Sequence, residues 1–131
     1  MLPFTLDTLR ISLHVLAVSV WVGGQLVVAA LVPVLRDISP DAPRLAARRF
    51  GQAAWPAFGL AVITGIWNLL EIPSGQTTEY QVTLGVKLLL VVASGVSAFI
   101  HTRTPSPAVR GATGGLGLLT ALGALVLGVM L

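Results

Sequence analysis

The sequence predicts an all-α, polytopic membrane protein, a bundle of four transmembrane helices with both termini outside. The 131 residues are 55% hydrophobic and only 10% charged, whereas a soluble domain carries about 25% charged residues. Four apolar runs are each long enough to cross a bilayer, which takes about 20 residues. Polar and turn-forming residues lie between these runs. We therefore expect one four-helix membrane domain over residues 1–131.

The first two helices are expected over residues 8–35 and 43–71. The first contains an uncharged apolar run, and Pro40 and Pro43 mark the turn after it because proline suits the entry to a helix. The run of residues is too long for a signal peptide and is followed by three more. The first helix is therefore interpreted as a membrane span.

The third and fourth helices are expected over residues 80–101 and 110–131, each preceded by a loop that contains proline. The fourth is rich in glycine and alanine. Small residues four positions apart, such as Gly117 and Ala121, let helix backbones approach closely. We interpret this helix as a packing element, and a homodimer through residues 110–131 stays open.

The orientation follows from the loop charges. The first and third loops and their flanks hold six arginines: Arg36, Arg44, Arg48, Arg49, Arg103 and Arg110. The second loop holds acidic residues and no basic ones. The positive-inside rule then places both termini outside, in a multi-pass protein of the inner (plasma) membrane. The net charge of +3 reflects this topology, so no nucleic-acid partner is expected.

The candidate functional residues are polar and aromatic side chains inside the spans. His14, Trp21 and Gln25 share one helix face, and a histidine within a span normally faces the protein interior or a cavity. In the predicted orientation Asn68 and Lys87 lie toward the same outer side. We therefore predict an outer-leaflet pocket lined by these five residues. The absence of cysteine excludes disulfides and thiolate metal ligands.

Simpler interpretations exist for the same residues. Lys87 can extend its ammonium group to the outer interface, and His14 can serve as a hydrogen-bonding residue between helices. The tryptophans suit packing. On the third helix Lys87, Ser94 and His101 share a face, and His101 next to Arg103 is interpreted as interfacial.

Five short motifs carry a resemblance to known proteins. They are Leu13-His14-Val15-Leu16, Trp21-Val22-Gly23-Gly24, Arg48-Arg49-Phe50, Thr64-Gly65 and Val86-Lys87-Leu88-Leu89-Leu90-Val91. Over most of the first three helices the chain resembles the CopD-type copper-resistance membrane domain and the related HemJ-type protoporphyrinogen oxidases. The resemblance implies a four-helix membrane bundle.

The two types imply different functions. The HemJ type implies an essential histidine and lysine for porphyrin oxidation and haem b binding, which correspond to His14 and Lys87. The CopD type implies passage of copper into or across the inner membrane. Copper favours soft ligands, yet this chain has no cysteine, and its methionines are Met1 and Met130. After the tryptophan motif the chain is apolar, whereas the HemJ type carries further polar and aromatic residues.

Our first hypothesis is a redox protein that binds haem or a porphyrin in the outer-leaflet pocket. His14 would be the axial ligand, held in one tautomer by a hydrogen-bond partner. Lys87 would pair with a carboxylate of the ligand. Such an enzyme would be a membrane oxidoreductase acting on a porphyrin or an electron carrier. The alternatives are a copper transporter or copper-binding protein with His14 as metal ligand, and a structural accessory subunit of a membrane complex.

Overall fold

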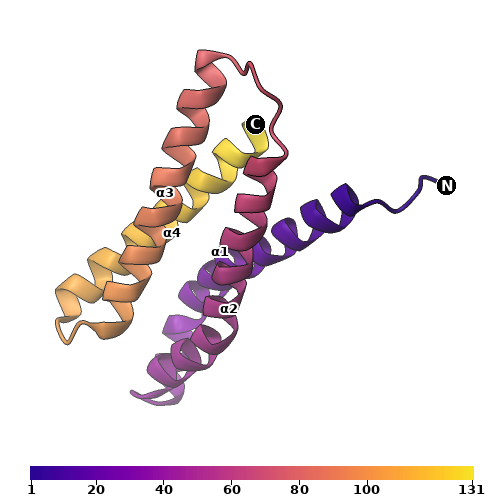
Figure 1. The fold of residues 1–131 in the computed structure, drawn as a ribbon. Coiled ribbons are helices and arrows are strands. Elements are labelled where there is room, and N and C mark those ends of the chain that lie inside the picture. Colours follow the sequence, from indigo (N-terminus) through magenta and orange to yellow (C-terminus); the bar gives the residue numbers. More distant parts are fainter. The chain divides into compact units, whose positions relative to one another are not determined.

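The computed structural model describes residues 1–131 and contains only helices. The four helices are α1 (Leu6–Ile38), α2 (Ala42–Leu70), α3 (Thr78–Arg103) and α4 (Pro107–Met130), as Figure 1 shows. Each is long and apolar enough to cross a membrane. The predicted fold class, an all-α protein with four membrane-length helices, is therefore confirmed.

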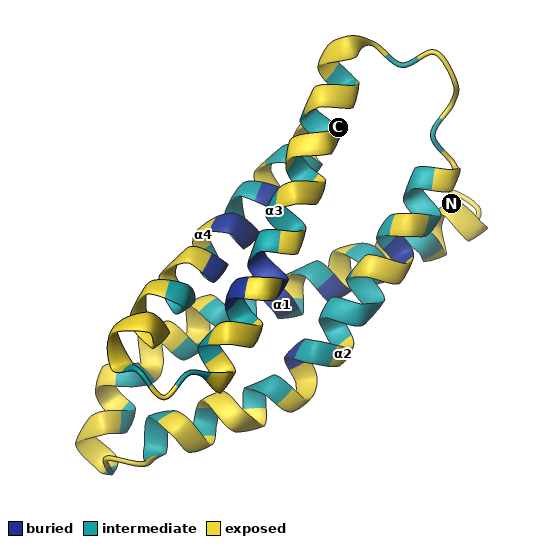
Figure 2. Cartoon of the chain, turned by 60° about the vertical axis from the view of Figure 1, so that its left-hand side comes forward, coloured by how far each residue is buried: buried dark blue, intermediate teal, exposed yellow.

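The chain divides into two compact units, Met1–Ile72 and Pro73–Leu131. Each unit is a helical hairpin, with α1 packed on α2 in the first and α3 packed on α4 in the second. Figure 2 shows buried positions on all four helices, while much of each helix surface is exposed. The exposed surface is rich in large aliphatic side chains such as Leu16, Leu89 and Leu119. Because such a surface is unfavourable in water, these helices belong in a lipid bilayer.

The helices begin two or three residues earlier than predicted, except α2, because capping residues precede them. The Thr5 side chain accepts a hydrogen bond from the Thr8 backbone at 3.1 Å, so α1 starts at residue 6 instead of 8. The Ser106 side chain accepts one from the Val109 backbone at 3.3 Å, so α4 starts at Pro107 instead of residue 110. Serine before proline is a regular start of a helix. No other predicted end differs by more than three residues.

Small residues hold α3 and α4 close together. Ser94 is fully buried on α3, and its hydroxyl donates to the Gly117 carbonyl of α4 at 3.0 Å. A Cβ atom at Gly117 would lie 3.5 Å from Ser97 Cβ and 3.7 Å from the backbone nitrogen of Ala98. The glycine-rich helix α4 therefore packs against α3 within this hairpin. Gly115, by contrast, is exposed and faces open space.

Candidate functional site

The side of α1 that packs on α2 carries the polar and aromatic residues singled out in the sequence. Trp21 is buried, and His14 and Gln25 are half-buried at helical spacing from it. Asn68 lies on α2 near the end of the same hairpin. The first unit therefore contains four of the five predicted pocket residues, and Lys87 belongs to the second unit.

His14 is attached to α2 through Thr64. The ring nitrogen Nδ1 of His14 lies 2.8 Å from Thr64 Oγ1. Thr64 is only 2% exposed, and its hydroxyl also lies 2.7 Å from the carbonyl oxygen of Leu60, one turn earlier in α2. A Cβ atom at Gly65 would sit 3.5 Å from His14 Cε1, so the imidazole lies against the Thr64–Gly65 backbone. Sequence reasoning missed Thr64 as the partner of His14.

Arg10 joins the two helices one turn farther toward the N-terminus. Its guanidinium group donates to Asn68 Oδ1 and, at 2.9 Å, to the carboxylate of Asp7. The Arg10 side chain is 12% exposed, whereas that of Asp7 is 71% exposed. Asn68 is thus engaged by an arginine. Arg10 is the one arginine outside the first and third loops and their flanks, on the predicted outer side, and sequence reasoning missed its contact between the helices.

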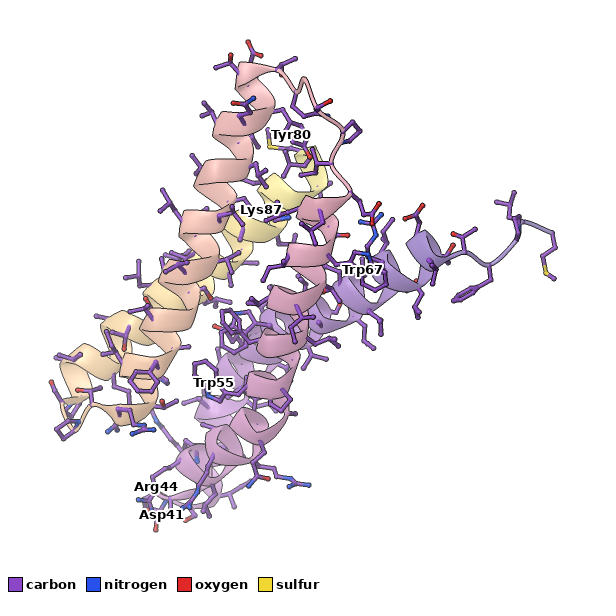
Figure 3. All side chains as sticks on the ribbon, viewed as in Figure 1. Asp41, Arg44, Trp55, Trp67, Tyr80 and Lys87 are labelled. Atoms are coloured by element: carbon purple, nitrogen blue, oxygen red, sulfur yellow. The ribbon has the colours of Figure 1, made fainter.

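Aromatic rings fill the hairpin on the other side of His14. The Trp21 ring lies 5.3 Å from the Trp55 ring and 4.5 Å from the Phe58 ring, measured between centroids. Trp55 is labelled on α2 in Figure 3. Gln25 donates from Nε2 to the Trp21 carbonyl at 2.9 Å, within its own helix. Trp21 thus contacts aromatic rings of α2, Gln25 bonds within its own helix, and His14 has a side-chain partner on the facing helix.

Lys87 occupies the contact between α3 and α4, and Figure 3 shows its side chain near α4. A Cβ atom at Gly128 would lie 3.2 Å from Lys87 Nζ, so the glycine makes room for the ammonium group. Two turns and four turns farther along this face, Ser94 and His101 donate to backbone carbonyls of α4. The His101 bond runs from Nδ1 to the Arg110 oxygen at 2.7 Å. This polar face of α3 is directed at α4.

The arrangement offers single imidazoles and no ready-made metal cluster. No group of three or more His, Cys, Asp or Glu side chains lies close enough together to hold a metal ion. One ring nitrogen of the His14 imidazole can still bind a metal ion or accept a hydrogen bond. The ammonium group of Lys87 can attract an anion.

Four apolar helices in two hairpins define the chain as a multi-pass membrane protein. Residues 44–131, about two thirds of the chain, match the family described as copper resistance protein D, or CopD. The chain belongs to this family, as its sequence motifs predict. The match covers α2 to α4, so Thr64 and Lys87 lie within it and His14 lies before it. No curated protein and no solved structure matches the chain.

Proposed function

We propose that the chain handles copper in the plasma membrane and that His14 contacts the metal as it is bound or moved. The observation that carries this proposal is a histidine inside an apolar span, attached by its side chain to the facing helix at Thr64. Such residues are costly in a bilayer and mark ion and substrate pathways. Imidazole is also a regular copper ligand. Membership of the CopD family supports copper as the cargo.

The donor set favours transient contact over storage. A resident copper site usually collects several nitrogen or sulfur ligands, and this chain has no cysteine and no metal-binding cluster. Its two methionines lie near the chain ends. One imidazole is enough for a cargo ion that exchanges its remaining ligands during passage. In this proposal copper is therefore a substrate of the chain and not a resident cofactor.

Two histidine variants test this proposal. Copper bound per chain is measured by equilibrium dialysis of the purified protein against Cu⁺, which detects an exchanging ion, with copper tolerance of the producing cells alongside. His14→Ala should lose most of the bound copper and the tolerance. His101→Ala is the matched control and should retain both, because His101 lies beside Arg103 in the last turn of α3 and not in the middle of a span. Equal losses in the two variants would contradict the assignment to His14.

A second candidate is the binding of haem or a porphyrin for a redox role, as the HemJ-type resemblance implies. The observation that favours it is Lys87, a cation in a membrane-length helix that forms no salt bridge with a carboxylate of the chain. Haem would supply one-electron chemistry at its iron. In this chain the ammonium group of Lys87 would attract a propionate.

The visible spectrum separates the two candidates. A Soret band in the purified protein supports the haem candidate, and bound copper without that band supports the first. For haem, Lys87→Met should abolish cofactor retention while the helical circular dichroism is unchanged, and Lys87→Arg should retain the cofactor. A Lys87→Met variant with full cofactor content would contradict the pairing and favour a lysine that only reaches the lipid interface. A protein with neither signal fits an accessory subunit.

The proposed orientation, with both termini outside, rests on the arginines in the first and third connections. Cysteine at Ser74, between α2 and α3, should react with an impermeant reagent added from outside. Cysteine at Pro105, between α3 and α4, should react only after the membrane is opened. Equal labelling of both positions in intact cells would overturn the orientation.

A further inference from the structure

We propose that Thr64 is a positioning residue that holds His14 as the Nδ1–H tautomer and so makes Nε2 the nitrogen that contacts metal. The second half of this inference rests on the proposed function, in which His14 contacts copper or iron. The first half concerns the protein without metal and can be tested separately.

The positions of the hydrogen atoms follow from counting donors and acceptors around the hydroxyl. Thr64 Oγ1 carries one hydrogen and lies 2.7 Å from the Leu60 carbonyl oxygen and 3.3 Å from that of Ala61. A carbonyl oxygen can only accept. Two oxygens at 2.7 Å without a hydrogen between them would repel each other, so the Thr64 hydrogen points to Leu60.

The bond to His14 must then run the other way. With its hydrogen directed at Leu60, the Thr64 oxygen accepts from His14 Nδ1 at 2.8 Å, and Nδ1 carries the hydrogen. A neutral imidazole has one ring hydrogen, so its lone pair is on Nε2. This is how metal-ligating histidines are oriented in general, through a hydrogen bond made by the other ring nitrogen.

The surroundings strengthen this arrangement. Thr64 is 2% exposed, so water does not compete for its hydroxyl, and a hydrogen bond in such a place is electrostatically stronger than in water. The hydroxyl is also held by its own helix, which fixes the oxygen independently of the imidazole. Thr64 can therefore select one tautomer of His14 before any metal arrives.

Thr120 offers a matched control in the other hairpin. Its hydroxyl lies 2.7 Å from the Leu116 carbonyl oxygen, the same bond to the preceding turn that Thr64 makes, and the residue is 9% exposed. No hydrogen bond joins Thr120 to an imidazole. Thr120→Val therefore removes the same intrahelical bond as Thr64→Val without touching His14.

The first test reads the tautomer directly. The full chain is labelled with ¹⁵N-histidine, kept free of metal in detergent, and its ring nitrogen shifts are measured at a pH where the rings are neutral. The variant His101→Gln contains only one histidine, so its spectrum shows which signals belong to His14. Wild type and Thr64→Ser should show His14 protonated at Nδ1, Thr64→Val should move the hydrogen largely to Nε2, and Thr120→Val should change nothing at His14.

Two results would overturn the proposal: a wild-type His14 protonated at Nε2, or His14 shifts unchanged in Thr64→Val. If Thr64→Val fails to fold, wild type and Thr64→Ser decide. Protonation of Nδ1 in both proteins supports the proposal, and protonation of Nε2 in either of them overturns it.

The second test measures copper affinity by competition between the chain and a chromophoric Cu⁺ chelator. Loss of a partner that orients a metal-binding histidine typically weakens metal affinity by about ten- to a hundredfold. Thr64→Val should show such a loss, and Thr120→Val should bind as wild type does. An Nδ1–H tautomer in a wild-type protein that binds no copper would support the assignment for Thr64 and overturn the proposed function. Equal affinity in Thr64→Val and wild type would overturn the role of Nε2.

Discussion

The two helices of each hairpin are held together, but by different parts of the chain in the two cases. In the α1–α2 hairpin, side chains meet side chains: Arg10 with Asn68, His14 with Thr64, and Trp21 with the rings of α2. In the α3–α4 hairpin, the side chains of α3 meet the backbone of α4. Its hydrogen bonds between helices end on carbonyl oxygens, and glycines lie opposite the polar groups.

This difference determines what a substitution can change. A backbone carbonyl is present whatever the residue, so the α3–α4 contact depends on small size at a few positions of α4. The α1–α2 contact depends on the chemistry of individual side chains, and a paired group that loses its partner in a low-dielectric span is left unsatisfied. A hairpin like α1–α2 suits a binding site, and a hairpin like α3–α4 suits a scaffold.

The largest expected effect comes from enlarging Gly117. Gly117→Leu should lower the free energy of unfolding by about 3 kcal/mol, because overfilled contacts cost up to about that much and the neighbouring atoms include backbone. Unfolding in mixed detergent, followed by circular dichroism, measures the change.

Gly115→Leu is the control for this prediction. Gly115 is exposed with nothing within 4 Å, so its substitution should not lower the free energy of unfolding and should raise it by up to about 1 kcal/mol through helix propensity. A loss as large as that of Gly117→Leu would reveal a second packed face on α4. Analytical ultracentrifugation of the two variants would then show whether a homodimer forms through that face.

A smaller effect is expected at Gly24, in the α1–α2 hairpin. A Cβ atom there would overlap the ring of Phe50, so Gly24→Ala should displace the ring and lower the free energy of unfolding by about 1–2 kcal/mol. Gly23 has nothing within 4 Å, and Gly23→Ala should raise stability by up to about 1 kcal/mol through helix propensity. Melting temperatures of the two variants should move in opposite directions. A shift of the same sign would show that the Phe50 ring gives way freely.

The smallest effect concerns the pair of Arg10 and Asn68. A double-mutant cycle with Arg10→Met and Asn68→Leu should give a coupling energy of about 0.6 kcal/mol, as hydrogen bonds between membrane helices average. Urea or detergent unfolding of the four proteins measures it. A coupling of zero would mean that the two side chains contribute separately to the hairpin.

The membrane spans could be predicted because each depends on a local property, the length of an apolar run. The positions of the helix starts were predicted less accurately, although the sequence contains the capping residues that mark them. Thr5 and Ser106 are capping residue types, and Pro107 directly follows the second of them. The early start of α4 follows from that pair alone. Capping depends on one or two residues and is easily outweighed when long apolar patterns are compared.

The partner of His14 depends on the register between α1 and α2, which no local pattern contains. The turn after Ile38 sets this register, and Thr64 lies about as far after the turn as His14 lies before it. Counting outward from the turn would have placed the two residues within one helical turn of each other. The bond of Arg10 to Asn68 follows the same register. Which side chains then face each other depends on helix rotation, and only the structure supplies it.

The antiparallel geometry also sets how much of the chain lies between the two partners of each contact in the first hairpin. Pairing that begins at the turn joins Gly24 with Phe50 early, then the aromatic rings. The His14–Thr64 bond closes a separation of 50 residues, and the Arg10–Asn68 bond closes one of 58. Longer closures cost more chain entropy. Because Thr64 lies in the last third of α2, a chain arrested halfway through insertion of α2 has not yet formed the bond between His14 and Thr64.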